Sequence, residues 1–356
     1  MGGTFVYSNP RVINWGAGSL SSIGEEARRL GATRVVLVTT ESVWGNTSSK
    51  SLILRALEPT PPEAVCFIHQ HAPQADLERA IEVRLSVKAD LVVSVGGGSP
   101  IDAAKVVARG SVNQNVAAAA VPHIAVPTTL SAAELGSRVG FTDESGDKAG
   151  FEDPGMLADA VFYDPDLAVF TPTWLWLSTG IRSLNHGVDG LLAEGEHPLS
   201  DVLALEAIRR LFHALPLVLA DPLDVGARSE CQVASWFSFT LPEPTAMGLG
   251  HRMSSKIGAR HGIPHGITSC LLLPHVMRYL SDRNPGAMRR IGTALDSMLG
   301  GSVSAPDRIY DFIGALGLPQ HSAEYGIGPA EFRKAAGQLA GAYPADDLFH
   351  VYMQSI

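Results

Sequence analysis

The sequence predicts an α/β fold in which a mostly parallel sheet, covered by helices on both faces, precedes an all-helical second half. Strand and helix signals alternate through the first half, a glycine-rich turn joins one strand to a helix, and long helical patterns dominate from about Pro172. Such alternation is typical of parallel sheets with crossover helices. We expect an α/β domain over 1–163 and a helical domain over 164–356.

The elements of the first half follow from their apolar patterns. Short apolar runs predict strands, and periodic apolar residues predict helices. The expected strands are Phe5–Val12, Arg34–Thr39, Ala64–His69, Leu91–Val95 and His123–Pro127. The expected helices between them are Ser21–Leu30 and Ala75–Val87.

The second half reads as helices separated by prolines. The clearest pattern is Asp201–Leu215, where apolar residues recur at three- and four-residue steps. Prolines disfavour helix interiors, so we expect them to mark helix boundaries. The prolines concerned are at 172, 198, 216, 222, 242, 244, 264 and 274.

Composition narrows the class of protein. The 356 residues are 46% apolar and 18% charged, with a net charge of −9 and no long basic block. Nucleic acid and anionic membranes are therefore not expected partners. The cysteines, Cys66, Cys231 and Cys270, form neither a metal-spaced pair nor a disulfide framework. With no secretory pattern and no apolar run of the ~18 residues that span a bilayer, we expect a cytoplasmic protein with a small-molecule substrate.

The most informative segment is the turn at Gly96-Gly97-Gly98, between an apolar run and an Ala-rich helical pattern that opens at a Ser99 cap. Glycines let the backbone approach a ligand, and the first amides of a helix attract anions. The segment therefore favours a pyrophosphate site. A simpler interpretation is that Ser99 and Asp102 form a capping box.

Histidines gather in the helical half. On a helix, Arg182, His186 and Asp189 share one face. Further histidines follow at positions 251, 261, 265 and 275. Imidazoles ligate divalent metals and transfer protons near neutral pH, so this group is a candidate site for either role.

Several motifs, in this order and spacing, resemble the iron-containing (group III) alcohol dehydrogenases, most closely their maleylacetate reductase branch. They are Arg11–Gly18, Gly96–Ser99, Ala125–Thr129, Asp153-Pro154, Tyr163–Pro165, Ile263–Gly266 and Leu273–His275. The resemblance implies a Rossmann-like N-terminal domain and a helical C-terminal domain (a dehydroquinate synthase-like architecture). It also implies hydride transfer between NAD(P)H and a carbonyl or activated double bond, and a homodimer as the assembly common in the family.

By position in the family, a set of residues should line the cofactor groove: Gly97, Gly98, Ser99, Asp102, Thr128, Thr129 and Lys148. An acidic residue after the second strand normally selects NAD over NADP. Here the place holds Thr39-Thr40, with Glu41 just beyond, so both NADH and NADPH are candidates.

The chain departs from the family at the metal site. His186, His251 and His265 match three metal-binding imidazoles, but Arg182 stands where the family has its ligand Asp. Unit charges ~4 Å apart interact by about 4 kcal/mol at an effective dielectric of 20, so a divalent ion beside Arg182 is disfavoured. We therefore expect no metal, as the maleylacetate reductase branch is generally regarded as metal-independent.

Arg182 is the preferred substrate anchor, because a guanidinium binds carboxylates bidentately. Arg252 and Lys256 are further candidates for substrate binding. Two other interpretations stay open: Arg182 pairs with Asp189 or a Glu and fills the vacated space, or Asp189 replaces the missing metal ligand.

A second departure affects proton transfer. Four residues after His251 the family usually has a histidine, and this chain has Ser255. The proton must then come from another histidine, with His186, His251, His261 and His265 as candidates.

The sequence thus predicts a metal-independent NAD(P)H-dependent reductase of a small oxo acid, such as maleylacetate or a related product of aromatic-ring cleavage. The alternatives are a metal-dependent alcohol dehydrogenase with rearranged ligands, or a scaffold repurposed for lyase or isomerase chemistry or for binding alone.

Overall fold

The computed structural model describes residues 10–58, 60–113, 120–195, 197–240, 248–258, 261–299 and 303–356. The chain forms two compact units. One comprises Tyr7–Pro172 and Leu223–Val233, and the other comprises Met1–Val6, Thr173–Pro222 and Ala234–Ile356. The domain boundary expected after Tyr163 stays a prediction. The two compact units divide after Pro172.

The first unit is built on a six-stranded sheet of order β1-β8-β5-β4-β2-β3, in which every pairing is parallel. Its strands are β1 (Val12–Trp15), β2 (Val35–Thr39), β3 (Pro62–Phe67), β4 (Leu91–Gly96), β5 (His123–Pro127) and β8 (Ala160–Tyr163). The parallel sheet predicted from the apolar runs is therefore confirmed.

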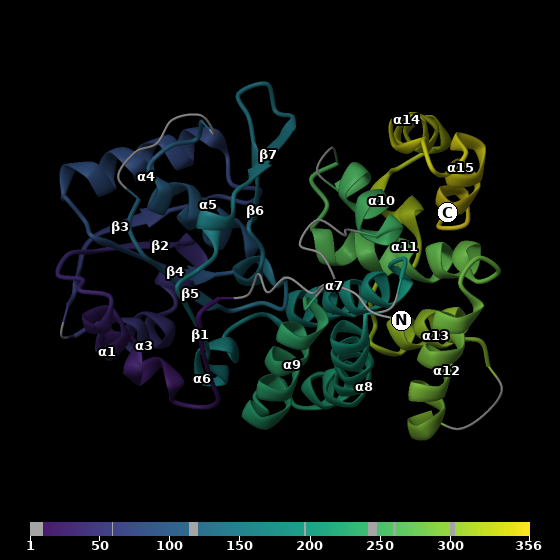
Figure 1. Cartoon of the computed structure of the whole chain (residues 1–356), viewed down its shortest axis with the longest axis horizontal. Coiled ribbons are helices and arrows are strands. Elements are labelled where there is room, and N and C mark those ends of the chain that lie inside the picture. The colour runs from purple at the N-terminus through teal and green to yellow at the C-terminus, as the bar shows by residue number, and fades with distance from the viewer. Residues whose placement is uncertain are drawn as a thin grey trace. The chain divides into compact units, whose positions relative to one another are not determined.

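Helices cover both faces of this sheet (Figure 1). Val36 and Val38 point to the side of α4 (Gln74–Ser86) and α5 (Gly98–Arg109). The alternate residues of β2 pack on the other side, against α1 (Ile23–Arg29) and α3 (Thr47–Ala56). Successive side chains of a strand point to opposite faces of the sheet. A strand that is apolar throughout therefore packs against helices on both faces.

The strand order contains a switch point between β2 and β4. The helices that follow these neighbours, α3 and α5, lie on opposite faces of the sheet. The carboxyl ends of the two strands meet there, and the Thr39 hydroxyl donates to the Val95 carbonyl at 2.8 Å. Open parallel sheets bind ligands at such points.

Three features of the first unit differ from the sequence predictions. An antiparallel hairpin of β6 (Arg138–Thr142) and β7 (Lys148–Glu152) was not predicted, nor was β8. The strand expected over Phe5–Val12 lies mostly outside the described residues, and β1 starts at Val12. Two short helices, α2 (Glu41–Gly45) and α6 (Pro165–Ala168), complete the unit.

The second unit is helical. Its central helix, α7 (Thr173–Leu192), is buried along most of its length and packs against α8, α10 and α11. The remaining helices are α8 (Pro198–Ala220), α9 (Val225–Ser238, up to Val233 in the first unit), α10 (Leu249–Gly258), α11 (His265–Leu280), α12 (Pro285–Leu299), α13 (Ala305–Ala315), α14 (Pro329–Leu339) and α15 (Ala345–Met353). One apolar core joins α10, α11, α14 and α15.

The expectation that prolines mark boundaries was wrong at two positions. Pro216 lies inside α8 and Pro274 inside α11, whereas Pro198 opens α8 and Pro264 precedes α11. An interior proline costs a helix ~3 kcal/mol. Both helices carry buried apolar residues on either side of the proline, and this packing offsets the loss.

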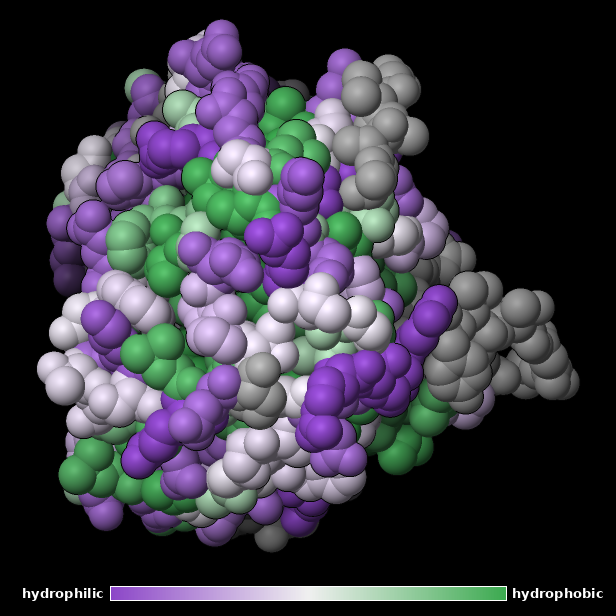
Figure 2. Space-filling view, turned by 90° about the vertical axis from the view of Figure 1, so that its left-hand side faces the viewer, coloured by the Kyte–Doolittle hydropathy of each residue, from purple (hydrophilic) through white to green (hydrophobic). Residues whose placement is uncertain are grey.

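Two surface properties bear on partners. No helix in the described ranges is both long and apolar enough to span a membrane. On the side of the first unit, hydrophilic residues surround separate apolar areas (Figure 2), and exposed leucines such as Leu54 and Leu85 stand on different helices. Scattered apolar residues are ordinary on a protein surface and assign no binding face.

Candidate functional site

A glycine corner forms where β4 ends and α5 begins. Gly96 has a φ of +147°, and a Cβ there would lie 2.6 Å from Cγ of Pro100. A Cβ at Gly97 would lie 3.1 Å from Cγ2 of Thr129. Both positions therefore favour glycine. Because the first amides of a helix have no intrahelical acceptor, the corner presents backbone donors to an anion.

The alternative interpretation of this segment, a capping box formed by Ser99 and Asp102, was wrong. Helix α5 starts at Gly98, with Gly97 as its N-cap and no side-chain cap. The Ser99 hydroxyl instead accepts a hydrogen bond from the His71 amide at 3.0 Å. The Asp102 carboxylate accepts from Lys105 Nζ at 3.0 Å and from the Gly140 amide at 3.3 Å. These side chains tie α5 to neighbouring segments.

Thr128 and Thr129, which follow β5, pack directly on the corner. The Thr128 amide donates to the Gly96 carbonyl at 2.9 Å. The Thr129 hydroxyl donates to Ser131 Oγ at 3.3 Å. Both threonines are buried, so the structure brings them together with Gly97 as the sequence predicted.

Lys148 and His71 lie beside this corner. A Cβ at Gly140 would lie 3.1 Å from Lys148 Nζ. Burial and the charge of Lys148 lower the pKa of His71. His71 has a left-handed φ of +66°, as has Ala72 at +49°, and such strain often marks functional loops. His71 was not predicted from the sequence, because no glycine signals its backbone conformation.

These residues fit the pyrophosphate of a dinucleotide cofactor. A Cβ at Gly98 would lie 3.4 Å from Ser131 Oγ, so the two glycines leave a cradle edged by hydroxyls. At the end of β2, the Thr40 hydroxyl accepts from the Val43 amide at 3.3 Å and caps α2. The first carboxylate beyond it, Glu41, is exposed.

A second group of predicted residues comes together in the helical unit. Arg182 Nη2 of α7 donates to His251 Nε2 of α10 at 3.4 Å, across 69 positions of sequence. The rings of His186 and His251 have centroids 5.7 Å apart. Phe239 packs edge-on against His186, with centroids 5.0 Å apart. We call Arg182, His186 and His251 the Arg–His cluster.

In the Arg–His cluster, His186 and His251 are buried and Arg182 is half-buried. His186 is 3% exposed, and neither ring nitrogen has a hydrogen-bond partner among the described residues. Burial, together with the charge of Arg182, lowers the pKa of His186 well below its ordinary value. His186 is therefore a neutral imidazole at physiological pH, able to donate one hydrogen bond and accept another.

Asp189 and Asn185 extend the same face of α7. Asp189 lies against the start of α10, where a Cβ at Gly248 would meet its carboxylate, and burial raises its pKa to about 7. Asn185 is fully buried, and its amide has no hydrogen-bond partner in the described part of the chain. The carboxyl group of Asp189 thus takes part in the packing of α7 against α10.

The other predicted residues lie elsewhere on α10 and α11. His265 opens α11, and its Nδ1 would lie 3.4 Å from a Cβ at Gly258. Arg252 and Lys256 are exposed on α10. His261 lies 3.8 Å from a carboxylate oxygen of Glu331 on α14.

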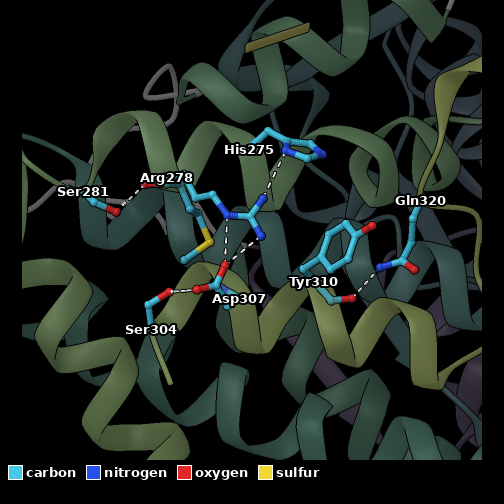
Figure 3. Close-up of polar contacts among 8 residues, drawn as sticks. His275, Arg278, Ser281, Ser304, Asp307, Tyr310 and Gln320 are labelled. Carbon is cyan, nitrogen blue, oxygen red and sulfur yellow. Dashed lines mark hydrogen bonds and ion pairs between the residues drawn. The ribbon is translucent and has the colours of Figure 1, made fainter. Parts of the chain in front are cut away.

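His275 serves a different contact (Figure 3). Its Nδ1 accepts from Arg278 at 3.2 Å, and Arg278 also binds the Asp307 carboxylate of α13 at 2.8 Å. Burial and the charges of Arg278 and His321 lower the pKa of His275 to about 4. Arg278, which this neutral histidine contacts, links α11 to α13.

The donor set does not fit a divalent metal. Among the described residues, no group of three or more His, Cys, Asp or Glu side chains is arranged to hold one. The guanidinium of Arg182 donates to the imidazole nitrogen of His251, whose lone pair a metal would require. Asp189, the alternative ligand, has its carboxylate against the start of α10 at Gly248.

Known proteins of one family match nearly the whole chain. Residues 10–165 match the iron-containing alcohol dehydrogenase family, and residues 176–345 match the C-terminal part of the Fe-containing alcohol dehydrogenase family. Maleylacetate reductase of Rhizobium sp. (strain MTP-10005) is 30% identical over 96% of this chain and 92% of its own length. The enzyme of that name from Burkholderia cepacia is 31% identical over 94% and 90%.

Solved structures agree. Maleylacetate reductase from Agrobacterium tumefaciens has a TM-score of 0.86 at 26% identity, covering 100% of this chain and 98% of that one. A 1,3-propanediol oxidoreductase, at 23% identity, shares the fold with a TM-score of 0.92 over 99% of this chain and 100% of that one. The resemblance and the fold class predicted from the sequence are therefore confirmed. The chain belongs to the iron-containing alcohol dehydrogenase family, within its maleylacetate reductase-like branch, and is an oxidoreductase.

Proposed function

We propose that this protein is a metal-independent reductase that uses NADH or NADPH to reduce a small oxo acid, with maleylacetate or a related ring-cleavage product as substrate. The relatives named maleylacetate reductase support the substrate class. The single observation that carries the proposal is the guanidinium of Arg182 against His251, in the Arg–His cluster.

The glycine corner supplies the cofactor site. The open amides at the start of α5 bind the pyrophosphate, and Lys148 adds a positive charge near it. The end of β2 carries Thr39 and Thr40 where a carboxylate would repel a 2′-phosphate, and Glu41 beyond them is exposed. Either cofactor is therefore accepted, and the bound reduced nicotinamide supplies a hydride.

Arg182 acts on the oxygen that gains charge. Whether the hydride adds to a carbonyl carbon or to the far end of a conjugated double bond, negative charge develops on the keto oxygen. A guanidinium stabilises that oxygen, or binds a substrate carboxylate through two parallel hydrogen bonds. Neutral His186 orients the same substrate through its ring nitrogens.

His251 provides the proton. While Arg182 donates to its Nε2, that nitrogen carries no proton. A substrate anion competes for the guanidinium, so the Nε2 lone pair becomes available to take up a proton from water. His251 then delivers this proton to the reduced substrate as a general acid, at the atom left with the electron pair.

The test is an assay of purified protein with maleylacetate and either cofactor, followed by the loss of reduced-nicotinamide absorbance. We expect oxidation of at least one cofactor, with one oxo acid consumed per hydride. No oxidation with either cofactor, although both bind, contradicts the substrate assignment. Failure to bind either cofactor favours the non-redox alternative.

A further inference from the structure

The N-terminus of α10 meets an acidic side chain from another helix. The carboxylate of Asp189, which is 5% exposed and lies on α7, packs against the start of α10 at Gly248, and the nearby amides of Gly248, Gly250 and His251 favour its charged form. A carboxylate close to the first amides of a helix stabilises its start, because the helix dipole favours negative charge there. Here that carboxylate comes from a different helix.

The glycines around this carboxylate are required by close packing. A Cβ at Gly248 would overlap the carboxylate of Asp189, and a Cβ at Gly250 would lie 2.6 Å from Asn185 Oδ1. Only glycine at both positions admits these polar side chains to the first turn of α10. The start of α10 therefore packs closely on α7, with Gly248 against Asp189 and Gly250 against Asn185.

The next residue along is His251. Its amide is near the Asp189 carboxylate, and its imidazole accepts from Arg182, which is on the same α7 face. Arg182 and Asp189 are two turns apart on one helix, so Arg182 contacts the imidazole of His251 while Asp189 lies near its backbone. The side chain of His251 has its orientation fixed from both sides.

We infer that Asp189 is a positioning residue, whose carboxylate holds the start of α10 so that the imidazole of His251 stays against Arg182. This inference rests on the proposed function, because it treats His251 and Arg182 as the reacting pair. The role differs from metal ligation, since the carboxylate is directed to backbone amides.

The variants Asp189→Asn, Asp189→Ala and Gly248→Ala test it. Asn keeps an oxygen acceptor for the amides, Ala removes it, and the Gly248 change displaces the carboxylate. We expect kcat for the oxo acid to fall from wild type through Asp189→Asn to Asp189→Ala, while the KM for the cofactor is unchanged. Gly292→Ala is the matched control, because a Cβ there meets nothing within 4 Å, and it should leave kcat unaltered.

A second readout needs no turnover. Ring signals of His251 in long-range proton–nitrogen NMR spectra are assigned by their loss in His251→Gln. We expect them to shift in Asp189→Ala and Gly248→Ala but to stay near wild type in Asp189→Asn and Gly292→Ala. Unchanged His251 signals in folded Asp189→Ala overturn the inference. A wild-type protein inactive on maleylacetate contradicts the proposed function alone, and the spectra still decide the role of Asp189.

Discussion

The glycine corner and the Arg–His cluster differ in the groups that they leave available to a ligand. At the corner, side chains are engaged by the chain itself: Ser99 by the His71 amide, Asp102 by Lys105 and Gly140, and Thr129 by Ser131. Backbone amides are what remains for a ligand. In the cluster, side chains such as His186 and neighbouring Asn185 are buried without hydrogen-bond partners among the described residues.

Phosphate binding by backbone amides depends little on the identity of the side chains, whereas the chemistry of a side-chain site depends on each residue. Backbone amides bind phosphate whatever the residues nearby, provided that no Cβ blocks them. A site made of side chains changes its chemistry with one substitution, as when Arg182 stands in place of a metal ligand. Changes at the corner should therefore affect cofactor binding, and changes in the cluster should affect turnover of the oxo acid.

The largest expected effect is that of Arg182→Gln. Loss of the guanidinium should lower kcat/KM for the oxo acid by about 10²–10³-fold, the usual cost of removing a donor to a developing oxyanion. Cofactor affinity, measured by nicotinamide fluorescence, should not change. Arg182→Lys keeps the charge but lacks the planar guanidinium, so its kcat/KM should lie between those of wild type and Arg182→Gln. A Gln variant with wild-type kcat/KM would remove the distinction between the two sites.

The next effect concerns Glu134, a buried carboxyl that accepts from the Tyr163 hydroxyl at 2.7 Å. Burial raises its pKa from 4.5 to about 7. Because the pKa of Glu134 is higher in the folded than in the unfolded state, the protein is most stable at pH values below the unfolded-state pKa. This stability, up to about 3 kcal/mol, is lost as the pH rises through the folded-state pKa.

Glu134→Gln should flatten this dependence, because the amide keeps an acceptor without a charge. The measurement is urea unfolding at about pH 5 and about pH 8, with exposed Glu58→Gln as control. An equal fall in unfolding free energy over this range in wild type and Glu134→Gln would show that burial of this carboxyl is not responsible.

Gly97→Ala sharpens the comparison at the corner. Its Cβ would lie 3.1 Å from Thr129, so the threonine must move away from the cradle. We expect the cofactor KM to rise about tenfold, equivalent to ~1.4 kcal/mol, with kcat little changed. Gly286→Ala, where a Cβ meets nothing within 4 Å, is the control. A fall in kcat alone would place the corner in the chemistry.

The smallest effect should come from His261→Ala. His261 lies 3.8 Å from Glu331 of α14, and such partly exposed ion pairs contribute about 0–1 kcal/mol. We expect kcat within about twofold of wild type. A loss of kcat that exogenous imidazole restores would make His261, not His251, the proton donor.

The sequence predicted the elements whose burial is uniform. Strands β2, β4 and β5 are buried along their whole length, and such strands read as continuous apolar runs. The β6–β7 hairpin was missed because β6 buries only Val139 and Phe141 and β7 buries no residue, so neither strand forms a continuous apolar run. Strand β8, with four residues, was too short to stand out.

The site was predictable only where helical spacing or family motifs placed residues together. Spacing put Arg182, His186 and Asp189 on one face, but could not tell which helix approaches that face. The contacts between Asp189 and α10 join segments far apart in sequence, so no local pattern reveals them. For the same reason, the bond from His71 to Ser99 was not foreseen.

The most direct test of the account is turnover of maleylacetate by protein stripped of metal with a strong chelator, with metal content measured on the same sample. Because Arg182 supplies the positive charge, we predict unchanged kcat without metal and no gain on adding zinc or iron. Activity lost on stripping, and restored by one tightly bound ion per chain, would contradict it.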